Sequence, residues 1–400
     1  MSLGWIDFSK HERDKVLNVI HLLDEPGAVD ELGIGAIRDA FADYFFPGTS
    51  TVQTRAKYFL IVPYVLMEAG SGKYGSDLNH ILRRIDNEER HCRDILIKTS
   101  NDGVIGSLVP NSWVLRTPSN IYWNGIKRIG IFKEDLSVKE YISQSIIQRR
   151  LKKAKEYGNR EKDAEENERD DIDAGDITSI QFWCLGNTYH SNWREKLTIE
   201  LLPEEAAFLK SQIITNQRET LFAFILKNNI SLDKYGSFGA LSEAIENSVN
   251  PELRYMMELA NDFNNLVSLI TTRYNLIVFD GKNEKAREKW NVLSKDIKRR
   301  SEVNLTSIFN RLNIKNVKLR TFLLRIQEAI RAGDIAAVDA LIIKREIALK
   351  GAKRAKTSHV GEYKEQDTNW IGIDILDYRY TPAKRIIKDI MNAITCVPEK

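Results

Sequence analysis

Cysteine and histidine are scarce in this chain of 400 residues, and their spacing removes several classes of function. The three cysteines, Cys92, Cys184 and Cys396, are odd in number, widely separated and without CxxC spacing. Neither a disulfide framework nor a zinc site is therefore expected. The six histidines form no HxxxH or HExxH arrangement, so a zinc hydrolase is not expected either. The sequence predicts no metal site and no cofactor.

A long hydrophobic run is also missing. The longest, residues 59–67, contains Pro63 and is far too short to span a bilayer. The first residues include Asp7 and Lys10 where a signal peptide needs an apolar core. We therefore predict a cytoplasmic protein without a membrane partner.

Motifs of nucleotide hydrolysis and of nucleophilic catalysis are absent as well. No GxxxxGK[ST] occurs, Gly33-Ile-Gly35 lacks a third glycine, and there is no GxSxG. Glu362-Tyr-Lys364 has the Glu-x-Lys spacing of metal-dependent nucleases, but no strand is evident around it. The sequence therefore favours a protein with no catalytic residues, and leaves a cryptic metal-dependent nuclease as a distant alternative.

Apolar residues recur mostly at helical intervals, which predicts a mostly all-α fold. A helix is expected over residues 8–23 and a second over 33–46, and Pro47-Gly48 then makes a turn. Ser50 and Gln53 form a capping box, so a third helix is expected from Ser50 to about Val62, where Pro63 should end or kink it. Helix, tight turn and helix together resemble a helix-turn-helix.

Further helices are expected over 77–97, from Ser119 onward, over 284–299, 304–312, 316–331 and 334–350, and from Thr381. Residues 253–277 carry an apolar seam through Phe263 that does not include Leu266, and 197–202 is the best strand candidate. Residues 161–176 contain nine Asp and Glu against two Lys and Arg, typical of a charged linker. Three domains follow: a helical 1–135 with the helix-turn-helix-like segment, a charged helix and linker 136–180, and a helical bundle-like 181–400.

The net charge is only +3, but it is unevenly distributed. Residues 282–356 hold 20 Lys and Arg against 8 Asp and Glu, a local excess of 12, whereas the rest of the chain holds 39 against 48. This asymmetry indicates an acidic partner, either nucleic acid or a protein surface. Solvated helix faces without a ligand would give the same pattern.

Two short segments carry the candidate nucleic-acid contacts. In the first, hydroxyls and cations at a helix start could meet phosphates, and an amide could reach a base edge. In the second, aromatic rings beside cations could stack on and clamp a strand. Both segments could instead be structural, with Ser50 as a cap and the aromatic rings in the core. The candidates are Ser50, Thr51, Gln53, Thr54, Arg55 and Lys57, and then Arg116, Tyr122, Trp123, Lys127 and Arg128.

The same segments resemble a known family. Phe46-Pro-Gly-Thr-Ser-Thr-Val-Gln-Thr-Arg-Ala-Lys-Tyr-Phe59, Pro118-Ser-Asn-Ile-Tyr-Trp-Asn-Gly125 and the opening Gly4-Trp-Ile-Asp-Phe8 are similar to the bacterial domain-of-unknown-function family 6361, over the whole chain. The resemblance brings no activity and no catalytic residue. It implies an association with phage-defence or restriction-like gene clusters, and hence work beside DNA-handling enzymes.

The leading hypothesis is therefore a non-catalytic DNA-associated or adaptor subunit of a bacterial defence assembly, with duplex DNA and other subunits of that assembly as partners. A protein-binding scaffold without nucleic-acid contact is the alternative. An exposed apolar patch would favour the scaffold, whereas converging carboxylates in a cleft would favour the nuclease.

Overall fold

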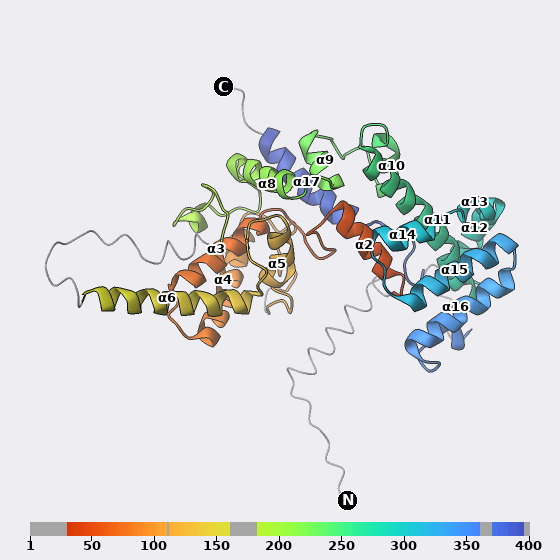
Figure 1. The fold of residues 1–400 in the computed structure, drawn as a ribbon, viewed down its shortest axis with the longest axis horizontal. Helices are drawn as coiled ribbons and strands as arrows, with labels where there is room; N and C mark the ends of the chain where they lie inside the picture. The colour runs from red at the N-terminus through yellow and green to blue at the C-terminus, as the bar shows by residue number, and fades with distance from the viewer. Residues whose placement is uncertain (1–29, 110–111, 161–181, 361–369, 396–400) are drawn as a thin grey trace, which may run out of the picture. The chain divides into compact units, whose positions relative to one another are not determined.

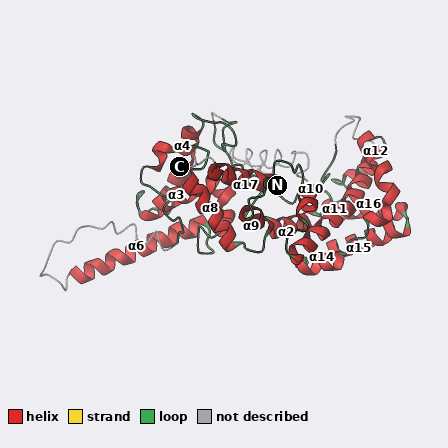
Figure 2. Ribbon diagram, turned by 90° about the horizontal axis from the view of Figure 1, so that it is seen from above, coloured by secondary structure: helices red, strands yellow, loops and turns green. Residues whose placement is uncertain are grey.

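The computed structural model describes residues 30–109, 112–160, 182–360 and 370–395. These residues form helices joined by loops and no strand, as Figures 1 and 2 show, so the expected all-α class is confirmed. The helix expected over residues 8–23 lies outside the described residues. Within them, no helix combines the length and the apolarity needed to cross a membrane.

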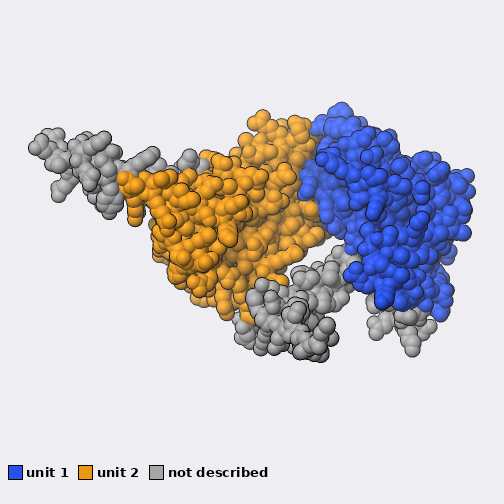
Figure 3. Space-filling model, turned by 60° about the horizontal axis from the view of Figure 1, so that its bottom comes forward, with its two compact units in different colours: residues 1–44, 235–378 blue, residues 45–234, 379–400 orange. Residues whose placement is uncertain are grey.

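The chain groups into two compact units, each built from an early and a late segment (Figure 3). Unit 1 comprises residues 1–44 and 235–378, and unit 2 comprises residues 45–234 and 379–400. The three consecutive domains expected from the sequence remain a prediction, and these units divide the chain differently.

Unit 2 is organised around one helix that is apolar on nearly every side. Helix α3 is buried along most of its length and packs against α4, α5 and α6, while α17 packs against α8 and α9. Asp77 caps α4 by accepting the His80 N–H, at the start of the helix expected over 77–97. The helices are α3 (Tyr58–Ser71), α4 (Leu78–Leu96), α5 (Pro118–Arg128), α6 (Val138–Arg160), η1 (Trp193–Lys196), α8 (Pro203–Asn216), α9 (Leu221–Lys227) and α17 (Tyr380–Thr395).

Unit 1 surrounds the long helix α11, which carries the predicted apolar seam and packs against α12, α13 and α16. Asn and Asp side chains cap its helices repeatedly: Asn250, Asn283, Asn304, Asn316 and Asp334 each accept a backbone N–H three residues later. Its elements are α2 (Gly35–Phe45, of which Phe45 belongs to unit 2), α10 (Phe238–Ile245), α11 (Pro251–Val278), α12 (Glu284–Leu293), η2 (Ser294–Asp296), α13 (Ile297–Arg300), α14 (Leu305–Arg311), α15 (Val317–Ala332), α16 (Ile335–Lys350) and η3 (Lys356–Ser358).

The prediction for the third helix is wrong at both ends. Helix α3 begins at Tyr58 after Lys57 and continues through Pro63 to Ser71, so Ser50 is not its cap. The Gln53 side chain accepts the Ser50 N–H at 3.1 Å and donates to the Gly48 carbonyl at 3.0 Å, which holds residues 48–53 in a turn. The tight turn of a helix-turn-helix is therefore replaced by the longer connection 46–57.

Three smaller expectations are also wrong. Residues 197–202 form no strand, although Leu197, Ile199 and Leu201 of this loop are buried. Helix α5 begins at Pro118 with Thr117 at its cap position, so Ser119, where this helix was expected to start, lies within its first turn. Leu266 is as fully buried as Phe263, because helices pack on α11 from more than one side.

Candidate nucleic-acid interface

The first candidate segment forms a loop whose polar side chains are largely bonded within unit 2. Gln53 is buried in the turn described above. The Thr54 hydroxyl donates to the Gly103 carbonyl at 2.6 Å. Thr51 is exposed, and Ser50 is half-buried with no hydrogen-bond partner for its hydroxyl. Of the four, only Thr51 offers an exposed side chain.

Arg55 is held by an ion pair from the end of the chain. Its Nε lies 3.0 Å from Oδ2 of Asp389 on α17, and both side chains are nearly enclosed. Asp389 also accepts the Ala56 N–H at 2.8 Å, and burial raises its pKa although Arg55 acts in the opposite direction. Asp102 adds a further ion pair at 3.3 Å. Arg55 is therefore bonded to acids far away in the sequence rather than left open to a phosphate.

Lys57 is bonded in the interior of unit 2. Its Nζ donates to both carboxylate oxygens of Glu205 at 2.6 and 2.7 Å, with side-chain exposures of only 4% and 6%. Glu205 also accepts the Leu202 N–H at the start of α8. The pair therefore joins the start of α3 to the start of α8.

The two candidate segments meet through Tyr122. The Thr54 and Arg55 N–H groups donate to the buried Tyr122 hydroxyl at 2.8 and 3.0 Å. A Cβ on Gly125 would lie 2.4 Å from the Gly48 carbonyl oxygen, so glycine is required for this close approach. Tyr122 and Gly125 of the second segment thus hold helix α5 against the loop of the first segment.

The remaining candidates of the second segment divide between paired and open side chains. The Trp123 indole N–H donates to the Leu136 carbonyl at 2.9 Å, and its ring packs against Phe132. Lys127 pairs with Asp135 at 2.7 Å. Arg116 and Arg128 are exposed and have no side-chain partner among the described residues.

The basic region 282–356 of unit 1 also contains both kinds of cation. Lys285 and Lys289 pair with Asp374, and Lys350 and Lys356 pair with Glu31. Others are exposed without a side-chain partner among the described residues. We call these the open cations: Arg287, Lys295, Lys298, Arg299, Lys315, Lys318, Arg325, Arg331, Lys344 and Lys353.

The open cations lie on or beside α12, α13, α15 and α16. Arg325 and Lys344 line one groove of about 520 Å³ between α15 and α16, together with Glu328 and Asp334. Exposed acids offset part of the charge: Glu284, Glu288, Asp296, Glu302, Glu328 and Asp334. The charge count of the sequence indicates this region but does not distinguish its open side chains from its paired ones.

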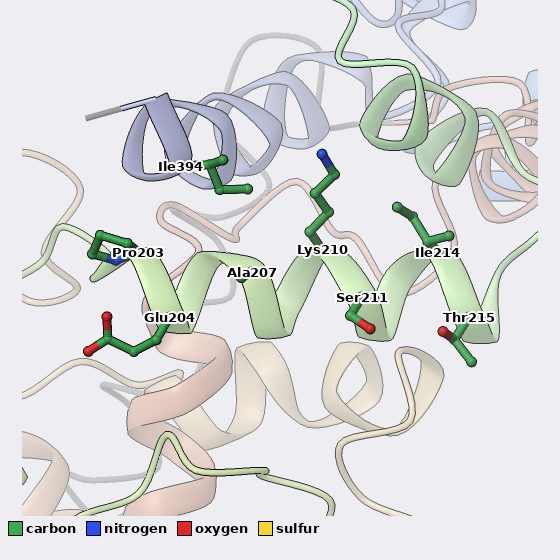
Figure 4. A pocket seen from close by; sticks show the side chains of 8 residues that line it. All are labelled: Pro203, Glu204, Ala207, Lys210, Ser211, Ile214, Thr215 and Ile394. Atoms are coloured by element: carbon green, nitrogen blue, oxygen red, sulfur yellow. The ribbon is translucent and has the colours of Figure 1, made fainter. Parts of the chain in front are cut away.

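Unit 2 contains a groove of about 800 Å³ along α8. Pro203, Ala207 and Ile214 line it, and Ile394 of α17 lines its opposite side (Figure 4).

A second cavity in unit 2 is lined by Asp86 and Glu89, which are not among the candidate residues of the sequence analysis. The sequence signal that could have indicated them is a pair of acids three residues apart, close to Leu82 and Ile85.

The described residues offer few groups suited to catalysis. No group of three or more His, Cys, Asp or Glu there could hold a metal ion. Cys92 is buried, and burial raises the pKa of its thiol to about 12. Glu362 and Lys364 of the nuclease-like spacing lie outside the described part of the chain.

Fold and site together define an all-helical protein with two compact units and a partly open basic region. Residues 1–154 match the model of DUF6361, a family of unknown function, and this confirms the family resemblance for that part of the chain. The matched segment contains both motifs that meet at Tyr122. Comparison with curated proteins and with solved structures gave no match.

Proposed function

We propose that this protein is a non-catalytic, DNA-associated subunit that contacts duplex DNA through the open cations of unit 1. The observation that carries the proposal is their freedom from side-chain partners among the described residues. A cation that is already paired, such as Lys57, must break its bond before it can meet a phosphate. An open cation needs only to give up water.

The chemistry favours affinity with little sequence preference. Each cation that neutralises a phosphate releases a counterion, so binding weakens steeply as salt rises. The exposed acids among the open cations reduce the local field, so we expect modest affinity at physiological salt. The defence assembly in which such a subunit would act rests on the family resemblance alone.

The test is a fluorescence anisotropy titration of a labelled duplex at several salt concentrations. We expect binding at low salt, and a triple variant Lys318→Ala/Arg325→Ala/Lys344→Ala should reduce the slope of log affinity against log salt by about one unit per contact removed. The matched control is Arg116→Ala/Arg128→Ala, which removes exposed cations from unit 2 and should leave the slope unchanged.

Two outcomes would contradict the proposal. Absence of binding at low salt would remove DNA association altogether, and the apolar groove on α8 would then favour the second candidate function, a protein-binding scaffold. A decrease in the salt slope confined to the Arg116→Ala/Arg128→Ala variant would indicate that the second candidate segment, and not unit 1, contacts the DNA.

A further inference from the structure

A cavity of about 460 Å³ lies in unit 2 where the first turns of two helices meet the side of a third. Helix α4 contributes Asp86 and Glu89, and α5 contributes Ser119 from its first turn and Trp123 from its middle. The start of α6 contributes Lys139. Cavities of this size hold small organic ligands, and a few convergent polar groups commonly fix their orientation.

Acceptor oxygens are prominent among the polar groups of this cavity. Glu89 is only 2% exposed and accepts the Ser119 N–H at 2.7 Å. Asp86 accepts the Trp113 indole N–H at 2.7 Å through one oxygen, and its other oxygen has no partner among the described residues. Two carboxyl groups therefore line one cavity, and neither pairs with a cation among the described residues.

The helix starts do not make this an anion site, because a carboxyl group already accepts a backbone N–H at each of them. Glu89 accepts an N–H of the first turn of α5. At α6, Ser137 and Glu140 form a reciprocal cap, in which Glu140 accepts the Ser137 N–H at 2.7 Å. At α6 the Glu140 carboxylate also offsets the positive end of the helix dipole. Lys139 is exposed and can extend into solvent.

We propose that this cavity binds a small organic cation, an ammonium group on an apolar or aromatic stem, between the Asp86 and Glu89 carboxyl groups and the Trp123 ring. Carboxylates supply charge and hydrogen-bond acceptors to an ammonium ion, and a tryptophan ring attracts cations through its π face. The ring is held in place by its indole bond to Leu136 and by its contact with Phe132. This site is separate from the open cations of unit 1.

The protonation state of Glu89 predicts a specific observable, the release of a proton when the cation binds. Burial raises the pKa of Glu89 to about 8, although hydrogen bonds from Ser119 lower it. The other titratable or charged groups around it are Asp86 and Cys92 on α4, Tyr58 on α3 and Lys139. At neutral pH Glu89 is mostly protonated, so a bound cation will favour its ionised form and release a proton.

The experiment is isothermal titration calorimetry of the full chain with benzylammonium and with benzyl alcohol, its neutral counterpart of similar shape. We expect saturable binding of the cation and at least roughly tenfold weaker binding of the alcohol, as expected for pairing with a nearby opposite charge. Titrations at pH 7 in buffers of different ionisation enthalpy should reveal the released proton.

Matched variants locate the site. Glu89→Gln keeps an acceptor for the Ser119 N–H, should weaken the cation roughly tenfold and should abolish proton release. Asp86→Asn keeps an acceptor for Trp113 and should weaken the cation while proton release persists. Glu134→Gln, an exposed acid outside the cavity, should change neither. Thermal midpoints of all variants report folding.

The proposal is overturned if benzylammonium shows no saturable binding, if the alcohol binds equally well, or if folded Glu89→Gln binds the cation like the unmodified protein. Titration of the same variants with duplex DNA tests cation binding and DNA binding separately. Glu89→Gln should leave DNA affinity unchanged, whether or not the cation binds.

Discussion

Lys57 and Lys318 both stand at the start of a helix, yet the structure uses them in opposite ways. Lys57 precedes α3, is 4% exposed and is bonded to Glu205, whereas Lys318 in the first turn of α15 is exposed without a side-chain partner among the described residues. The region 282–356 contains both cases, because its open cations lie in the same region as cations that pair with Asp374 or Glu31. A cation-rich segment becomes available to a ligand only where the fold brings no carboxylate to it.

The largest effect should follow from breaking the Lys57–Glu205 pair. Lys57→Met leaves a buried carboxylate without its cation, which we expect to cost roughly 3 to 5 kcal/mol of unfolding free energy. Urea unfolding measures it. Lys318→Met is the matched control and should stay within about 0.5 kcal/mol. Adding Glu205→Gln to Lys57→Met should recover stability, because glutamine can still accept the Leu202 N–H. Equal losses at Lys57 and Lys318 would contradict the distinction.

A somewhat smaller effect is expected at Arg55. Arg55→Ala leaves Asp389 with the Ala56 N–H but without its cation, and should cost about 3 kcal/mol. The remaining folded protein should bind duplex DNA with an unaltered salt slope. Arg325→Ala should do the reverse, with stability kept and a slope lower by about one unit. A stable Arg55→Ala protein with weakened DNA binding would indicate that this segment contacts DNA.

Local patterns predicted most helices, because periodicity and capping act within a few residues. Asp77 before α4 and Asp334 before α16 are caps whose signal lies in the adjacent sequence. Pro63 misled the prediction for α3, since a helix buried among three others tolerates the missing N–H that would normally end it. Tertiary packing decided that boundary.

The fate of the candidate site residues could not be predicted in this way. The partner of Arg55 lies 334 positions away in the chain and that of Lys57 lies 148 positions away. No local pattern carries that information. The charge excess of residues 282–356 was visible in the composition, but which of its cations stay open depends on acids such as Glu31 and Asp374 outside that region.

Glu89 extends the comparison to a buried acid that pairs with no cation among the described residues. Its pKa of about 8 lies above the ordinary 4.5, so the folded state holds the proton more tightly than the unfolded state. The stabilisation is complete below the ordinary pKa and is lost as the pH rises through 8. Relative to Glu89→Gln, the unmodified protein should lose about 2 kcal/mol between about pH 6 and pH 8. Parallel pH profiles from urea unfolding would contradict this.

The smallest effect separates a real helix cap from an apparent one. Ser50→Ala should change the unfolding free energy by no more than a few tenths of a kcal/mol, because the Ser50 hydroxyl accepts no helix N–H. Asp77→Ala should cost about 1 kcal/mol, because the Asp77 carboxylate accepts the His80 N–H at 2.6 Å. Thermal and urea unfolding of both variants measure the difference. A loss at Ser50 equal to that at Asp77 would show that the loop 50–57 is helical in solution and exposes its hydroxyls and cations as a helix start. The contrast between Lys57 and Lys318 would then no longer hold.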